Sequence, residues 1–441
     1  MIRQQRGECT HLCCDLLFYM LQYLVVKKMK NSTKKNYDIA VLGGGASGMM
    51  AAICAARVGA SVVLLECNDS LGRKLLATGN GKCNFTNKYM KSACYFSQAP
   101  DFVETALGLF SEKDTVSFFR ELGVLSTERE GYFYPRSQQA KTIRNALERE
   151  LDRLNVAVLL SARVRDVKKD KDVFEIKYGD DVLEASKVIM AMGGKASDIK
   201  GSNGDGYYYA TKMGHTLVPL VPALVQLHTN HPDMDQIAGV RCDSILSLYC
   251  NNQLLDTQRG ELQLTKQGLS GIVTFQLSRM AAYGLQEGKN VDIKVDFLPE
   301  ISEQRLEQWI EDSSVSGMTI GQTLLGMFHE KLVPLILKTA KIYGDMSPKN
   351  MSKKQMSRLI QSIKAHEFQI TDTHGFKSAQ VTGGGISTKE INPKTMESLI
   401  IPGLYITGEI MDVDGICGGY NLQWAWTSGA LAGKDAAKDS I

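Results

Sequence analysis

A glycine-rich turn between two apolar runs constrains this 441-residue chain more than any other feature. Residues 37–42 have the apolar, β-branched character of a buried parallel strand, and they lead directly into the sequence GGGASG at 43–48. The Ala- and Met-rich stretch 49–58 favours a helix, and 61–65 is again strand-like with Glu66 at its end. This order of strand, turn, helix and strand predicts an α/β fold of the Rossmann type.

The turn fits the pattern G-x-G-x-x-G, in which each glycine has its own physical role. Gly43 permits the tight turn, Gly45 lets the backbone approach a pyrophosphate, and Gly48 lets the helix pack closely on the strand. The free N–H groups and the dipole at the helix start attract phosphates. Glu66 can accept hydrogen bonds from a ribose diol and repels a 2′-phosphate, which argues against NADP at this site. An adenine dinucleotide is therefore predicted.

The fingerprint fits both FAD and NAD, so the choice depends on the rest of the chain. Arg73 and Lys74 follow the acid closely and can offset phosphate charge. The polar loop 78–87 offers backbone and side-chain donors, among them Thr78 and Asn84. A plain surface loop would explain this polarity but not its position directly after the ribose-binding acid. We therefore expect the loop to contact the cofactor.

Short strand-like runs separated by polar turns come next, and the last of them ends at Gly193. Two-layer FAD-binding domains carry a β-meander at this point, whereas simple NAD dehydrogenases continue with another βα unit. We therefore expect a β-meander and FAD. The runs are 156–160, 163–168, 173–178 and 182–192.

The C-terminal part of the chain also favours FAD. A strand-like run at 403–407 leads into Gly408 and Glu409, and an acid at the end of a strand can bind the polyol linker of a flavin. The glycine-rich segment 412–423 then precedes an Ala-rich helix over 424–437, whose start can direct N–H groups at the negative side of a reduced flavin ring. A C-terminal core helix with a glycine-rich cap is the simpler interpretation, but it does not by itself explain why Glu409 stands at the end of the strand.

Charge is distributed unevenly along the chain. The net charge is +3, but residues 1–36 hold seven basic and two acidic side chains, so residues 37–441 amount to −2. A body this close to neutral lacks the basic excess of proteins that bind nucleic acid. The ten cysteines form no C-x-x-C pair and the seven histidines show no ligand spacing. We expect a small organic substrate, no nucleic acid, no metal, and a cytoplasmic location.

The N-terminal 36 residues contain an apolar run at 12–26. This run has 15 residues, with Asp15 inside it, whereas a spanning helix needs about 20. No cleavage motif of the A-x-A type follows it. We expect residues 1–36 to be a disordered or non-native extension, with Met29 as the alternative start, and no stable membrane insertion. A membrane role remains the alternative interpretation.

Residues 196–375 show no second dinucleotide fingerprint, and we expect them to form an inserted substrate or lid domain. The many short β-like runs up to about residue 300 indicate a small β-barrel, whereas about 301–365 shows helical spacing. The FAD-binding domain would then consist of residues 37–195 and 376–441. Ser270 lacks the G-x-S-x-G context of a hydrolase nucleophile. No catalytic acid or base is assigned.

Several blocks resemble the bacterial FAD-dependent oxidoreductases of the aminoacetone-oxidase-like and 3-dehydro-bile-acid delta(4,6)-reductase-like type. The most specific are GNGKCNFTN at 79–87 and DVDGICGGYNLQWAW at 412–426. Lys266 and Ile272 depart from the pattern, because many members have His and Pro there. The two specific stretches belong to the blocks 72–87 and 403–433, and the other blocks are 37–48, 204–206, 260–271 and 379–385.

The resemblance implies a two-dinucleotide-binding-type (Rossmann-like) FAD domain with a β-meander, interrupted by a β-barrel and a helical substrate domain. It also implies non-covalent FAD. The FAD contacts that it carries over are Gly43, Gly45, Ala46, Ser47, Glu66, Arg73, Lys74, Thr78, Asn84, Val164, Glu409, Asn421 and Leu422. The cofactor-binding glycines and acid added from the sequence pattern are Gly48, Gly193, Gly408, Asp414 and Gly419.

The expected activity is that of a reductase. In this hypothesis FAD takes a hydride from NADH or NADPH and passes it to an enone-type double bond in a steroid-like or other small organic substrate. The nicotinamide is expected to visit transiently, because the chain has one dinucleotide fingerprint. The alternatives are an amine oxidase that uses O2, a flavin-dependent RNA-modifying protein, and a non-catalytic redox sensor.

Overall fold

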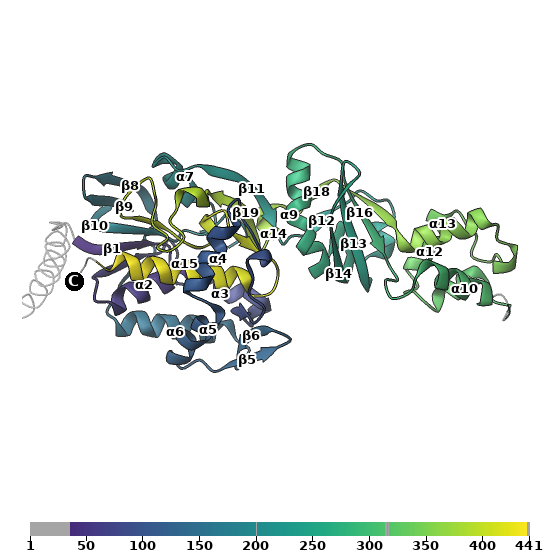
Figure 1. Ribbon diagram of the computed structural model, residues 1–441, viewed down its shortest axis with the longest axis horizontal. Coiled ribbons are helices and arrows are strands. Elements are labelled where there is room, and N and C mark those ends of the chain that lie inside the picture. The colour runs from purple at the N-terminus through teal and green to yellow at the C-terminus, as the bar shows by residue number, and fades with distance from the viewer. Residues whose placement is uncertain (1–35, 200, 314, 316, 439–441) are drawn as a thin grey trace, which may run out of the picture.

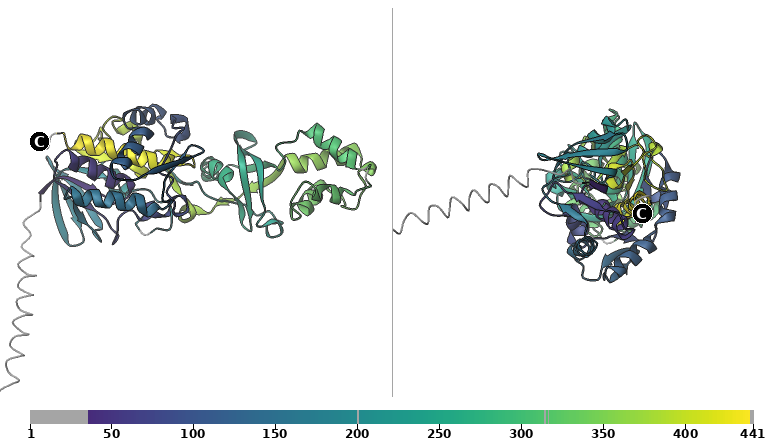
Figure 2. Two further views of the ribbon diagram at one scale, coloured as in Figure 1. Left: turned by 90° about the horizontal axis from the view of Figure 1, so that it is seen from below. Right: turned by 90° about the vertical axis from the view of Figure 1, so that its left-hand side faces the viewer.

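The computed structural model describes residues 36–199, 201–313, 315 and 317–438. The expectation for the N-terminal extension therefore lies outside the described residues, apart from Asn36, which begins the first strand. The molecule is elongated, with a mixed α/β lobe at one end, a sheet in the middle and a group of helices at the other end (Figures 1 and 2). Among the described helices, none combines the length and apolar content needed to cross a bilayer.

The α/β lobe is built on a seven-stranded sheet of Rossmann type. Strand β1 lies between β2 and β10 and pairs in parallel with both, and β20 pairs in parallel with β10. Strands β2 and β20 are buried throughout and β1 is buried from Ile39 onward, as their continuous apolar sequences predicted. The strands are β7 (Ala157–Leu159), β2 (Val62–Leu65), β1 (Asn36–Leu42), β10 (Asp181–Met190), β9 (Val173–Tyr178), β8 (Val164–Asp170) and β20 (Leu404–Ile406).

The predicted β-meander is present in β8, β9 and β10, which pair antiparallel in chain order. The run at 156–160 is not part of it, and that part of the prediction was wrong. Strand β7 instead pairs in parallel with β2, at the other edge of the sheet. The reason is that helix α6 (Ala140–Arg153) precedes β7 and returns the chain to the sheet as a crossover.

Helices α2 (Ala46–Arg57) and α15 (Tyr420–Ala436) lie side by side against the sheet (Figure 1). Glycines of α15 make this close contact possible. A Cβ on Gly429 would lie 2.4 Å from the carbonyl oxygen of Ser47, and one on Gly433 would lie 2.2 Å from that of Ala51. Segments from opposite ends of the chain therefore share one core.

Both of these helices begin earlier than predicted. The sequence indicated starts at 49 and 424, where the apolar character becomes continuous, but the first turns begin directly after Gly45 and Gly419. The remaining helices of the lobe are α3 (Arg73–Ala77), α4 (Pro100–Leu109), α5 (Glu112–Glu121) and α7 (Asp205–Lys212). Its short strands are β3 (Thr86–Asn87), β4 (Tyr95–Phe96), β5 (Ser126–Arg129), β6 (Tyr132–Pro135) and β21 (Asp414–Gly415).

The inserted part contains a seven-stranded antiparallel sheet, in the order β17-β16-β13-β14-β15-β12-β18. Its strands alternate buried and exposed residues, as a sheet with one face on a core requires. The strands are β12 (Leu227–His228), β13 (Arg241–Cys250), β14 (Gln253–Thr265), β15 (Gly268–Ser270), β16 (Val291–Asp296), β17 (His366–Ile370) and β18 (Asp372–Thr373).

The region with helical spacing forms helices at the far end of the molecule (Figure 1). Leu306, Ile310, Leu359 and Ile363 are buried, so the predicted apolar stripes face the core that the helices share with the sheet. The helices of the insert are α8 (Met234–Ile237), α9 (Ile272–Gln286), α10 (Glu303–Ser313), α11 (Ile320–Leu325), α12 (Leu332–Ala340) and α13 (Lys353–Lys364).

Two antiparallel strands, β11 (Leu217–Ala223) and β19 (Val381–Ile386), connect the lobe and the insert. Tyr207 and Tyr209 of α7 pack in the core of the α/β lobe, while Leu227 already belongs to the core of the insert. The division at residues 196 and 375 stays a prediction. The α/β lobe and the insert each have a hydrophobic core of their own.

Candidate functional site

A cavity of about 1060 Å³ lies at the carboxyl ends of the parallel strands β1, β2 and β10. Its lining comes from the glycine turn, the loop after α3, the start of α15 and the first turn of α9. Ligands in open α/β sheets bind at this edge of the sheet, where the strands end. The cavity is therefore the candidate functional site.

The glycine turn has the geometry that its sequence predicted. Gly43 has a φ of +108°, and a Cβ there would lie 2.4 Å from the carbonyl oxygen of Ala191. A Cβ on Gly48 would lie 1.9 Å from the oxygen of Gly43, so close packing of α2 on the turn requires glycine. At Gly45, in contrast, a Cβ would meet nothing within 4 Å. The space in front of Gly45 belongs to the cavity.

The start of α2 faces this space without a capping side chain. Its N-cap residue is Gly45, and its first turn contains no acidic residue. Ala46 and Ser47 of that turn line the cavity. A helix start with free N–H groups and no acidic residue in its first turn attracts an anion such as a pyrophosphate.

Glu66 lies at the end of β2 and lines the cavity while only 8% exposed. Its Oε2 accepts a hydrogen bond of 2.8 Å from the backbone N–H of Gly44. Its Oε1 accepts two hydrogen bonds of 2.8 Å from the backbone and side-chain nitrogens of Asn68. These bonds fix the carboxylate beside the glycine turn, which is the position that a ribose-binding acid requires.

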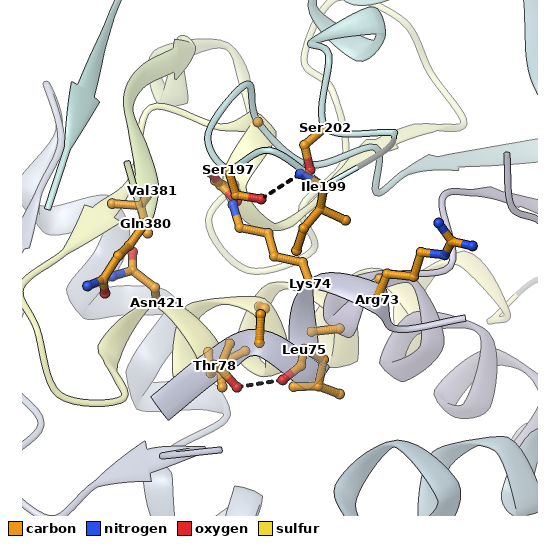
Figure 3. A pocket seen from close by; sticks show the side chains of 18 of the residues that line it. Arg73, Lys74, Leu75, Thr78, Ser197, Ile199, Ser202, Gln380, Val381 and Asn421 are labelled. Carbon is orange, nitrogen blue, oxygen red and sulfur yellow. Dashed lines mark hydrogen bonds and ion pairs between the residues drawn. The ribbon is translucent and has the colours of Figure 1, made fainter. Parts of the chain in front are cut away.

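Helix α3 and the loop after it form one wall of the cavity, and Gln380, Val381 and Asn421 lie across from them (Figure 3). The Nζ atom of Lys74 lies 2.6 Å from Oε2 of Glu409. The guanidinium of Arg73 forms an ion pair with Asp69, and Thr78 donates a hydrogen bond of 2.6 Å to the carbonyl oxygen of Leu75. Each predicted cation at this wall is therefore fixed by a carboxylate.

Asn84 presents a polar atom that has no partner among the described residues. Its Oδ1 is buried, and Asn84 itself lines the cavity. A buried acceptor without a hydrogen bond costs free energy, so a ligand that donates to it would gain affinity. Gly193 adds further open space, because a Cβ on it would meet nothing within 4 Å.

The start of α15 faces the same cavity. Gly419 caps it with a φ of +94°, no side chain caps it, and its first turn contains no acidic residue. Asn421 bonds both the N–H and the carbonyl oxygen of Gly415 at 2.8 Å, which fixes the loop before the helix. Asn421 and Leu422 line the cavity, so this second helix start is available to a ligand.

The structure brings most of the predicted FAD-binding residues to the cavity. Gly48, Gly408 and Asp414 do not line it. Gly48 lies behind the turn, a Cβ on Gly408 would lie 2.5 Å from Oγ of Ser47, and Asp414 pairs with Arg279. Those that line it are Gly43, Gly45, Ala46, Ser47, Glu66, Arg73, Lys74, Thr78, Asn84, Val164, Gly193, Glu409, Gly419, Asn421 and Leu422.

Among the parts of the lining that sequence analysis missed are a hairpin and a helix start. One is the hairpin of β5 and β6, which contributes Tyr132 and Tyr134. The three consecutive aromatic residues after Gly131 are a strand signal, but they do not reveal what the strand faces. The other is the first turn of α9, with Ile272 and Phe275. Nothing local in the sequence marks these two, because a contact between lobes brings them to the cavity.

Cys417 lies at the apolar side of the cavity, packed with the cluster that includes Leu224, Phe275 and Val381. Burial raises the pKa of its thiol to about 12. The raised pKa favours the neutral thiol at ordinary pH. Within the described residues, no group of three or more His, Cys, Asp or Glu side chains could bind a metal ion.

The cavity fits the predicted FAD. The open space at Gly45 admits a pyrophosphate, and two uncapped helix starts face the same cavity. The unpartnered Oδ1 of Asn84 matches a group that donates hydrogen bonds. Glu66 lies at the position for a ribose diol.

Comparison with known proteins supports the same cofactor class. The sequence profile of the HI0933-like protein Rossmann domain family matches residues 37–435. The 3-dehydro-bile acid delta(4,6)-reductase of Clostridium scindens is 43% identical over 404 residues, covering 91% of this chain and 99% of that protein.

Two ribosomal RNA dihydrouridine synthases are also similar. That of Escherichia coli is 31% identical over 412 residues, covering 92% of this chain and all of that protein (100%). That of Haemophilus influenzae is 31% identical over 395 residues, covering 88% of this chain and 95% of that protein. The similarity to all three relatives extends over both lobes.

Proposed function

The chain belongs to the HI0933-like protein Rossmann domain family, and from this premise we propose that it is an FAD-dependent reductase. Its substrate is a bile acid or a related steroid-like molecule, and the reduced bond is a carbon–carbon double bond conjugated to a ketone. NADH or NADPH donates the electrons. The observation that carries the proposal is the 43% identity to a 3-dehydro-bile acid delta(4,6)-reductase, which extends over 99% of that protein.

The residues of the α/β lobe bind and orient the cofactor in this proposal. The N–H groups at the start of α2 bind the pyrophosphate, Glu66 binds a ribose, and Asn84 and Asn421 contact the flavin end. The ion pair of Lys74 with Glu409 keeps both side chains in the wall. When bound, FAD supplies the hydride that reduction of an enone requires.

The insert supplies part of an apolar wall for the substrate. This wall excludes water from the reacting atoms. Its residues from the insert are Leu224, Ile272 and Phe275, and Val381 and Ile416 add to it from the C-terminal part of the chain. An apolar wall of this kind suits the ring system of a steroid.

We also propose that the inserted sheet closes as a barrel. Strands β17 and β18 are separated in sequence by Thr371 alone, yet they pair at opposite ends of the strand order. A closed sheet has no free edges, which would give the insert a rigid frame for α9. In this arrangement the insert, from about 196 to 375, acts as the substrate domain.

A second candidate is reduction of a uracil ring in RNA. Two ribosomal RNA dihydrouridine synthases at 31% identity favour it, and the chemistry is the same, because the double bond of uracil is also conjugated to a carbonyl. The small-molecule substrate has the better support, from the higher identity of the steroid-type relative and from the near-neutral charge of residues 37–441.

The deciding experiment is anaerobic. The purified holoenzyme is titrated with NADH and with NADPH while flavin absorbance is recorded, and the reduced enzyme is then mixed with a 3-keto-4-ene steroid acid or with a uridine-containing RNA. We expect one nicotinamide to bleach the flavin and the enone to restore its colour. Restoration by RNA alone would favour the second candidate. Bleaching by an amine but by neither nicotinamide would contradict the reductase and support an oxidase.

A further inference from the structure

The hairpin formed by β5 and β6 presents a polar face to the cavity. Arg129 and Tyr132 are directly paired across the two strands, so their side chains lie on the same face. Tyr134 is two residues further along β6 and shares that face. All three residues line the cavity, and the hairpin therefore directs a cation and two phenol rings at whatever the cavity binds.

Lys82 reaches the cavity from the loop between α3 and β3. It directly follows the helical turn Thr78–Gly81 and lies four residues before β3, which pairs with β6 on the side opposite to β5. Lys82 also lines the cavity. The β5 strand and the loop before β3 thus contribute one cation each.

These two cations differ from the others at the cavity. Arg73, Lys74, Arg163 and Lys377 each form an ion pair, with Asp69, Glu409, Asp205 and Asp198 respectively. Within the part of the chain that the structure describes, no carboxylate is paired with Lys82 or Arg129. Glu130 is the one carboxylate of the β5–β6 hairpin that lines the cavity, and among the described residues it forms no ion pair with Lys82 or Arg129. One negative charge therefore stands against the two positive charges of Lys82 and Arg129.

The wall contributed by the insert has the opposite character. Ile272 is 60% exposed although it is a large aliphatic side chain, and it lines the cavity together with Phe275 and Leu224. An exposed apolar surface inside a binding cavity is a surface for ligand contact. The cavity therefore combines an apolar wall with a pair of cations that have no internal partner.

We propose that Arg129 and Lys82 select substrates that carry a carboxylate at one end of an apolar ring body. The inference rests on the proposed function and assigns its specificity to two residues. The guanidinium of Arg129 can bind a carboxylate through two parallel hydrogen bonds, and Lys82 adds a second charge. The ring body lies against Ile272 and Phe275 at the same time.

A binding measurement without any electron donor tests this selection independently of turnover. The holoenzyme is titrated with a saturated 3-keto steroid acid and with its methyl ester, and perturbation of the flavin absorbance gives the two Kd values. For the unmodified protein we expect the acid to bind at least about tenfold more tightly than the ester. For Arg129→Gln and for Lys82→Gln the ratio of the two Kd values should fall several-fold, and for the double variant it should approach one.

Arg136→Gln is the matched control, because Arg136 is an exposed cation at the end of the same hairpin and does not line the cavity. It should keep the ratio of the unmodified protein. Equal binding of acid and ester by the unmodified protein, or an undiminished ratio in the double variant, would overturn the inference. Arg129-dependent binding of a short oligouridylate, with no preference between acid and ester, would also overturn it and identify the anion as an RNA phosphate.

Turnover of the enone acid then tests the proposed function separately. If the unmodified protein binds the acid selectively but does not reduce the enone with either nicotinamide, the selection stands and the reductase proposal fails. If it reduces acid and ester with equal kcat/KM and binds them equally, the reductase proposal stands and the selection fails.

Discussion

Arg279 of α9 and Asp414 of β21 form a buried ion pair that joins the insert to the α/β lobe. The Nε atom of Arg279 lies 2.9 Å from Oδ1 of Asp414, and Asp414 is only 2% exposed. The guanidinium also lies 4.7 Å from the ring centre of Phe96 and 4.9 Å from that of Tyr283. Because α9 begins at the cavity with Ile272, this pair fixes the apolar wall relative to the loops that are predicted to bind the cofactor.

Removal of Arg279 should destabilise the protein in a pH-dependent way. In Arg279→Met the carboxylate of Asp414 stays buried without its counter-charge, and we expect the free energy of unfolding to fall by about 3 kcal/mol at about pH 8. Burial already raises the pKa of Asp414 to about 7 with Arg279 present. The folded variant then binds a proton that the unfolded chain releases, so its stability should rise as pH falls from about 8 to about 5. Urea unfolding at both pH values measures this.

The double variant Arg279→Met with Asp414→Asn provides the control for that experiment. It removes the buried charge, and it should recover part of the lost stability at about pH 8 while losing the pH dependence. An equal loss for the single variant at both pH values would mean that packing of the Arg279 stem, and not charge, accounts for the effect.

Glu66→Gln should weaken FAD binding. The substitution keeps the size of the side chain but replaces the charged acceptor that bonds the N–H of Gly44 and lines the cavity. Hydrogen bonds to charged groups contribute about 1.5–3 kcal/mol, so we expect the Kd of FAD to rise at least about tenfold. Reconstitution of the apoprotein, followed by flavin fluorescence, gives the Kd. Glu307→Gln, an exposed change on α10, serves as the control. An unchanged Kd for Glu66→Gln would contradict the assignment of Glu66 as the residue that binds a ribose of FAD.

Two alanine substitutions in the glycine turn should affect different properties: Gly45→Ala the binding of FAD, and Gly48→Ala the stability of the apoprotein. In Gly45→Ala the new methyl meets no protein atom within 4 Å and the φ of −80° suits alanine, so folding should be unchanged. The methyl occupies space that a pyrophosphate needs, and the Kd of FAD should rise at least about tenfold.

In Gly48→Ala the methyl would lie 1.9 Å from the oxygen of Gly43, so the backbone must shift and the apoprotein should lose about 1–3 kcal/mol of stability. Thermal unfolding of the two apoproteins, together with FAD titrations, separates the effects. A stable Gly48→Ala apoprotein would contradict the packing role of this glycine.

Glu150 should stabilise the protein at neutral pH and not in acid. It accepts hydrogen bonds of 2.7 Å from Arg153 and 2.8 Å from Arg57, which connects α6 to α2. Hydrogen bonding from Arg153, together with Arg57, lowers the pKa of Glu150. The stabilisation is therefore present above its ordinary pKa of 4.5 and is lost as pH falls further.

Glu150→Gln should cost about 1–2 kcal/mol at about pH 7, and the difference from the unmodified protein should shrink below about pH 4. Urea unfolding at the two pH values is the measurement. Glu121→Gln is the control, since its ion pair with Arg57 is largely exposed and should contribute little. A loss for Glu150→Gln that is independent of pH would contradict the charge-based explanation.

The sequence alone determined the fold class of the protein and the position of its candidate dinucleotide site. Gly43, Gly45 and Gly48 act through backbone geometry within a few residues, and Glu66 follows on the next strand, so local order was enough to predict the turn and the acid. The meander of β8, β9 and β10 was likewise predictable, because consecutive strands with short turns pair with their neighbours in sequence.

The tertiary structure decided what depends on contacts between distant segments. The pairing of β7 with β2 follows from a helical crossover. Asp414 lies outside the cavity because it pairs with Arg279. Helices α2 and α15 begin where they do because glycines cap them. Arg129 and Ile272 reach one cavity from different lobes. Neither residue type marks a binding site by itself, and only the fold brings the two into one cavity. The periodicity of a sequence shows which face of an element is buried, but not which distant surface lies opposite that face.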